Sequence, residues 1–120
     1  MPRKEPRDPR ALLWDMQEAA QAIAHFVAGV DEAVYAGSDL LHSGVERKFE
    51  IIGEALNQLS QSHPALATRV PQCAQVIAFR NQLIHGYALI DHATVWGVIT
   101  NDLPVLHAAL AELLRELPPP

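Results

Sequence analysis

Four polar side chains with complementary chemistry lie close together in the second half of the chain. Arg80, Asn81, His85 and Tyr87 fall within eight residues. An arginine fork matches phosphate oxygens, a histidine can move a proton near neutral pH, and an asparagine can orient either group. Around one phosphodiester, such groups could cleave RNA without a metal, because a base can take the proton of the ribose 2′-hydroxyl and the oxygen can then attack phosphorus. DNA lacks this hydroxyl and would be spared.

These residues are expected at the end of a helix, which the apolar spacing predicts over 72–85. Asn81 and His85 are four residues apart and share a helix face, whereas Arg80 diverges from His85 by roughly 140° and must reach around the turn. The helix dipole favours a positive charge on His85 while Arg80 opposes it, and His85 is the expected proton-transferring group. Tyr87 is expected beyond the helix.

A purely structural role for the same residues is an open alternative. Arg80 could pair with Glu54 or Asp91, and His85 could cap a helix end. A carboxylate within an apolar helix needs a partner, so Glu54 is a potential structural partner of Arg80 or Arg47, or else a residue of the site. Short polar motifs often arise by chance, and spacing alone therefore leaves both interpretations open.

The composition of the chain indicates one all-α domain. Its 120 residues are 49% hydrophobic but only 6% aromatic, with abundant Ala and Leu, a mixture that favours helices over strands. We expect a flexible basic arm over 1–8, a single helical domain over 9–117 and a tail over 118–120. Pro104 lies inside the last helix and should kink or split it.

Apolar residues recur at three- and four-residue steps along most of the chain. They predict helices over 9–30, 38–61, 72–85 and 91–117, with at most two further turns over 65–70. The expected architecture is an antiparallel bundle of four or five helices with short connections. Gly53 is expected to permit close helix packing. The two longest helices offer broad faces for a second subunit, so a homodimer is expected.

Charge and cysteine content argue against several classes of protein. The net charge is −5, and four of the nine basic residues lie in the first ten positions, so tight non-specific binding to long polyanions is not expected. Cys73 is the only cysteine, and the six histidines lack the helical spacing of a ligand pair. No metal or other cofactor is therefore expected. No membrane segment is evident, and a cytoplasmic location is expected.

The wider sequence around the motif resembles the HepT-like HEPN family, the toxin component of HepT/MNT toxin–antitoxin systems. The family pattern is arginine, four residues, histidine, one residue and tyrosine, filled here by Arg80, His85 and Tyr87. The segments 44–55 and 91–106 are similar to two further helices of the family.

The resemblance implies an all-α homodimer in which two copies of the motif meet at a cleft. It implies a metal-independent endoribonuclease acting on an RNA substrate, with Arg80 and His85 catalytic and Asn81 supporting them. One imidazole cannot conveniently be both base and acid, and a dimer would supply two. The implied partner is a cognate MNT-type nucleotidyltransferase antitoxin, which could neutralise the toxin by transferring AMP to Tyr87. The alternative is a non-catalytic HEPN module that binds the nucleotidyltransferase or a nucleotide.

Overall fold

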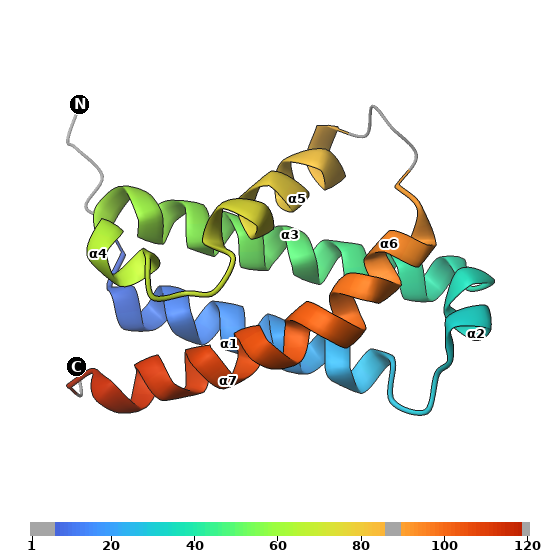
Figure 1. Cartoon of the computed structure of the whole chain (residues 1–120), viewed down its shortest axis with the longest axis horizontal. Helices are drawn as coiled ribbons and strands as arrows, with labels where there is room; N and C mark the ends of the chain where they lie inside the picture. Colours follow the sequence, from blue (N-terminus) through green and yellow to red (C-terminus); the bar gives the residue numbers. More distant parts are fainter. Residues whose placement is uncertain (1–6, 86–89, 119–120) are drawn as a thin grey trace.

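The protein folds into an antiparallel bundle of helices (Figure 1). The computed structural model describes residues 7–85 and 90–118. Its long helices are α1 (Pro9–Phe26), α3 (Asp39–Ser62), α5 (Cys73–His85) and α7 (Leu103–Glu116), and successive long helices run in opposite directions. The shorter elements are α2 (Glu32–Ala36), α4 (Pro64–Ala67), α6 (His92–Gly97) and the π-helical segment η1 (Val98–Asp102). Because the described residues contain no strand, the predicted all-α bundle is confirmed.

Short polar side chains cap the helices where the sequence changes from loop to apolar repeat. The Asp8 carboxylate accepts a hydrogen bond from the amide of Arg10 at 2.8 Å, at the start of α1. Ser38 Oγ accepts one from the amide of Leu41 at 3.2 Å, at the start of α3. Asp91 caps α6 in the same way. These oxygens satisfy amides that have no partner inside the first helical turn.

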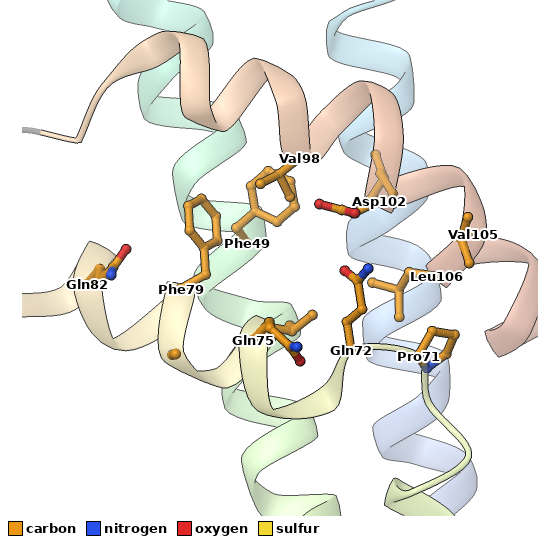
Figure 2. Close-up of a pocket in the computed structure, with 13 residues that line it drawn as sticks. Phe49, Pro71, Gln72, Gln75, Phe79, Gln82, Val98, Asp102, Val105 and Leu106 are labelled. Atoms are coloured by element: carbon orange, nitrogen blue, oxygen red, sulfur yellow. The ribbon is translucent and has the colours of Figure 1, made fainter.

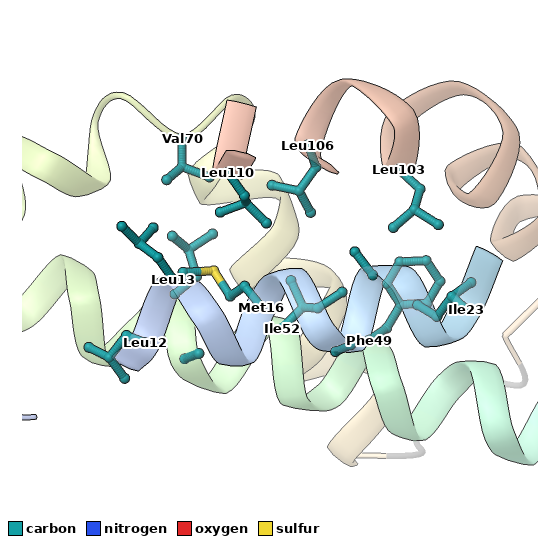
Figure 3. Packing of buried hydrophobic residues seen from close by; sticks show 14 of the residues in the cluster. Leu12, Leu13, Met16, Ile23, Phe49, Ile52, Val70, Leu103, Leu106 and Leu110 are labelled. Carbon is teal, nitrogen blue, oxygen red and sulfur yellow. The ribbon is translucent and has the colours of Figure 1, made fainter. Parts of the chain in front are cut away.

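The hydrophobic core lies between α1, α3 and α7 (Figure 3). Its largest fully buried aliphatic side chains include Leu12, Leu13, Met16 and Ile23 from α1, Ile52, Leu56 and Leu59 from α3, and Leu110 from α7. The apolar repeats of the sequence therefore point toward one another, as predicted for the first, second and last helices. By contrast, no residue of α5 is buried, and this helix packs mainly against α3.

The first long helix ends earlier than the apolar repeat predicts. It stops at Phe26, so Val27 and Val30 belong to the connection. Gly29 adopts a φ of +74°, a left-handed conformation that glycine takes without steric cost and that ends the helix. The five-residue helix α2 was not predicted, because so short an element cannot show a periodic apolar stripe.

The predicted break in the last helix takes the form of the π-helical segment η1. Pro104 is the second residue of α7, directly after this segment. A proline cannot donate a backbone hydrogen bond, and its ring crowds the carbonyl four residues earlier. The wider turn at η1 accommodates this crowding without ending the helix.

An aromatic cluster packs α2 and α6 against the start of α3. The rings of His42 and His92 stack with their centroids 3.5 Å apart, and Tyr35 packs against Trp96 at 5.4 Å. His42 Nε2 lies 2.6 Å from the carbonyl oxygen of Tyr35. The Tyr35 side chain is fully buried, and its hydroxyl has no hydrogen-bond partner within residues 7–85 and 90–118. This cluster sets the position of α6, which follows the motif helix in the chain.

Replacing Tyr35 with phenylalanine is expected to make the fold more resistant to alkaline unfolding. Burial, together with the nearby Glu46 carboxylate, raises the pKa of Tyr35 to about 12. The unfolded chain loses this proton near pH 10. The folded state therefore binds more protons between about pH 10 and pH 12, and its stability falls as the pH rises through this range.

The measurement is the free energy of unfolding of wild type and Tyr35→Phe in urea, at about pH 8 and about pH 11. Raising the pH should lower the free energy of unfolding less in the variant than in wild type, because phenylalanine has no proton to lose. An identical pH dependence would contradict the prediction.

The two ends of the helical body are tied together by Arg10. Its Nη1 donates hydrogen bonds to the carbonyl oxygens of Leu117 at 3.1 Å and Pro118 at 2.9 Å. Figure 1 shows both ends of the body at the left of the bundle, whereas α5 runs away from them and ends at the upper edge. Within the described residues, no helix combines the length and the apolar character needed to cross a membrane.

Candidate active site

The motif helix α5 lies very close to α3 because position 53 on α3 is glycine. A Cβ atom at Gly53 would lie 2.1 Å from Cβ and 2.6 Å from Cγ of Arg80, so no larger residue fits in this arrangement. Beside this contact, Phe49 and Phe79 pack edge to face with their ring centroids 5.3 Å apart. The two contacts fix α5 on α3, and they fix the point from which the Arg80 side chain extends.

Neighbours on both helices orient the guanidinium group of Arg80. Its Nη2 pairs with the Glu54 carboxylate of α3, and its Nη1 donates to Oδ1 of Asn81 at 2.8 Å. Glu54 also accepts a hydrogen bond from Gln58 at 3.3 Å. The Arg80 Nε–H is buried without a partner in the part of the chain that the structure describes. The fork is thus held in place while one of its donors stays unused there.

His85 is the last residue of α5, and its side chain is exposed. It lies five residues beyond Arg80, which is about 7.5 Å along the helix axis. The structure therefore brings Arg80, Asn81 and Glu54 into contact and places His85 farther along the same helix. Tyr87 lies outside the described residues. Asp91, the other potential partner of Arg80, instead accepts from the amide of Ala93 at 3.0 Å.

A polar groove of about 240 Å³ runs along α3 beside Arg80. Three arginines line it, and each is paired with a carboxylate that also lines it. The pairs are Arg7 with Asp15 at 2.8 Å, Arg47 with Glu50 at 3.4 Å, and Arg80 with Glu54. The groove thus gathers positive charge around the motif arginine and balances it with neighbouring carboxylates.

Glu50 and Gln58 also line this groove and were not predicted as residues of the site. Arg47 was predicted only as a potential partner of Glu54, whereas the structure pairs Arg47 with Glu50. The available signal was a polar stripe at positions 47, 50, 54 and 58, since residues three and four apart share a helix face. This stripe runs beside the apolar one on the same helix.

A second groove, of about 300 Å³, lies on another side of α5, between that helix and the η1–α7 segment (Figure 2). Phe49, Phe79 and Leu106 contribute apolar surface to it, while Gln72 and Asp102 are among its polar residues. The apolar side chains of Val76 and Phe79, which line this groove, are therefore only partly buried.

Two further observations concern metal ligands and the single cysteine. No group of three or more His, Cys, Asp or Glu side chains among residues 7–85 and 90–118 could hold a metal ion. Cys73 is half-buried at the start of α5, and burial raises the pKa of its thiol. A raised pKa favours the thiol over the nucleophilic thiolate, as expected for a packing residue.

A family model described as "Ribonuclease HepT-like" matches residues 16–113 of the chain. The chain belongs to the HepT-like family. The match runs from α1 to the last turn of α7, so the resemblance inferred from the motif and two further helices is confirmed. It covers α3 and the motif helix α5, which carry most of the residues that line the polar groove.

Curated relatives of the HepT-like chain carry ribonuclease names. One from Methanocaldococcus jannaschii, named a "Putative RNase", is 31% identical over 98 residues, covering 82% of this chain and 89% of the relative. A "Probable ribonuclease HepT" from Thermococcus cleftensis is 26% identical over 109 residues, covering 91% and 98%. A "Gamma-glutamylcyclotransferase and putative RNase" from M. jannaschii is 26% identical over 111 residues, covering 92% of this chain but 50% of the relative. No solved structure gives a significant match.

Proposed function

We propose that the protein is a metal-independent endoribonuclease and the toxin of a HepT/MNT toxin–antitoxin pair. The observation that carries the proposal is the arrangement around Arg80 on the motif helix of a HepT-like chain. Glu54 and Asn81 hold the Arg80 fork, and His85 lies at the exposed end of the same helix. The ribonuclease names of the relatives support the same activity.

The reaction is an attack of a ribose 2′-oxygen on the adjacent phosphorus. His85 takes the proton of the 2′-hydroxyl, the new oxygen–phosphorus bond forms, and the bond to the 5′-oxygen breaks. Arg80 stabilises the negative charge on the phosphate oxygens as the transition state forms. The leaving oxygen takes a proton from a second, protonated imidazole. The products are one fragment ending in a 2′,3′-cyclic phosphate and one beginning with a 5′-hydroxyl.

The second imidazole comes, in this proposal, from a second copy of the chain. A homodimer that joins two motif helices supplies one His85 as base and the other as acid. The surface of α5 supports this arrangement, because it carries Val76, Phe79 and Ile84 although no residue of the helix is buried. Ile84 is 48% exposed and the other two are partly buried, so a partner that covers this remaining apolar surface would add stability.

The test is cleavage of a single-stranded RNA by the purified protein in excess EDTA, with the same sequence as DNA beside it. We expect RNA fragments with cyclic phosphate ends and intact DNA. If the RNA stays intact although the protein binds its nucleotidyltransferase or a nucleotide, the non-catalytic binding module is the better description.

The antitoxin is expected to add AMP to Tyr87. The intact mass of the protein should rise by one or more AMP units after incubation with the cognate nucleotidyltransferase and ATP, and Tyr87→Phe should abolish the rise. The chain has two tyrosines, and Tyr35 is fully buried, so Tyr35→Phe is the matched control and should still be modified. Modification that persists in Tyr87→Phe would place the acceptor elsewhere.

A further inference from the structure

Arg47 lies in the same polar groove as the motif arginine, on the exposed edge of α3. It is seven residues from Glu54, the partner of Arg80, which corresponds to roughly 10 Å along the helix axis. Its side chain is 69% exposed, and its Nη1 lies 3.4 Å from Oε2 of Glu50. Exposed ion pairs between residues three apart on a helix contribute little to stability. Arg47 can therefore exchange Glu50 for another anion at low cost.

We propose that Arg47 is a second phosphate-binding residue, which holds a phosphate of single-stranded RNA beside the one bound by Arg80. The inference rests on the proposed ribonuclease function and adds a positioning residue to it. A guanidinium fork can donate two parallel hydrogen bonds to a phosphate, which fixes the direction of the strand as well as its position. Two forks along one groove would align the RNA so that the bond at Arg80 is the one cleaved.

The charge distribution of the chain supports this assignment. With a net charge of −5 and nine Lys and Arg residues, the protein cannot hold RNA by a general positive field. Its affinity must come from a few local contacts. Arg7, Arg47 and Arg80 all line one groove, and of these Arg47 is the most exposed. Its partner Glu50 is only 25% exposed, so it can keep the arginine oriented while the groove is empty.

The experiment measures RNA binding by fluorescence anisotropy over a range of salt concentrations. Each protein carries His85→Ala as well, so that the labelled single-stranded RNA is not cut. Arg47→Ala is expected to weaken binding about tenfold, as loss of a charged hydrogen bond does. It should also reduce the slope of log K against log salt by about 0.7, the contribution of one phosphate contact on a single strand. In the cleavage-competent protein, Arg47→Ala should raise KM more than it lowers kcat.

The chain offers a closely matched control on another helix. Arg115 of α7 is paired with Glu112 three residues away, and its side chain is 68% exposed. Arg115→Ala therefore removes the same charge and the same kind of ion pair outside the groove, and RNA binding should stay within twofold of the parent. Substitution of the carboxylate partners tests the opposite change in RNA affinity. Glu50→Gln frees Arg47 and should tighten binding, whereas Glu112→Gln should leave it unchanged.

Three outcomes would overturn the inference while leaving the proposed function intact. In the first, Arg47→Ala binds RNA as tightly as the parent. In the second, Arg115→Ala weakens RNA binding as much as Arg47→Ala does. In the third, Arg47→Ala weakens binding of the nucleotidyltransferase but not of RNA. If the protein with His85 intact neither binds nor cuts RNA, the proposed function fails and the inference fails with it.

Discussion

RNA cleavage by the His85→Ala variant is expected to fall by about 10²–10⁴-fold, the usual contribution of a positioned general acid or base. His85 is the proton-transferring group of the proposed reaction, and no other histidine lies in the motif helix. Because its side chain is exposed at the end of α5, its removal should cost little packing. RNA binding and the thermal unfolding temperature should therefore stay close to those of wild type.

The matched control for this substitution is His25. It lies in the last turn of α1 and is exposed, as His85 is in the last turn of α5. Single-turnover cleavage rates of wild type, His85→Ala and His25→Ala should show a loss in the motif variant alone. Wild-type rates in His85→Ala, or equal losses in both variants, would remove His85 from the mechanism.

A large loss of both stability and activity is expected for Gly53→Ala. The added Cβ would lie 2.1 Å from Cβ of Arg80, so α5 must move away from α3. Overpacking of this kind costs about 1–3 kcal/mol, more than the roughly 1 kcal/mol that alanine gains over glycine in helix propensity. Arg80 would leave its contacts with Glu54 and Asn81, and a shift of about 1 Å at such a site can lower the rate about 10²-fold.

Gly97 provides the comparison for this second prediction. It also lies in a helix, with φ −60° and ψ −41°, and among the described residues outside its own turn a Cβ there would meet nothing nearer than Nδ2 of Asn101 at 4.0 Å. Gly97→Ala should therefore be neutral or stabilising and fully active. The measurements are thermal unfolding and RNA cleavage of both variants. Wild-type stability in Gly53→Ala would show that the helices are not held as closely as the structure indicates.

The helical framework could be predicted from the sequence because its signals are local and long. The repeats of α1 and α3 extend over several turns, and Asp8 and Ser38 mark their starts. Elements without such a repeat could not be predicted. Helix α2 is one and a half turns long at most. The π-helical form of the break before Pro104 depends on how the chain packs, which the position of the proline does not specify.

The candidate site could be predicted only in part, because its residues are assembled across helices. The motif indicated Arg80, Asn81 and His85, which lie on one helix. The pairing of Arg80 with Glu54 joins residues 26 positions apart and was one of several open alternatives. Arg47 was assigned no role at the site, since an exposed arginine on a helix is ordinary. Only the fold shows that it shares a groove with the motif.

The two hydrogen bonds from Arg10 to the carbonyl oxygens beyond α7 have a consequence for how this fold can be combined with others. They bring the entry and the exit of the helical body to one point, and α5 runs away from this end of the bundle. A body whose ends meet can be joined to a neighbouring domain, or inserted into one, without stretching its helices. One M. jannaschii relative is matched over only half of its length, and its name gives two activities. Such a name is what modular use of this fold would produce.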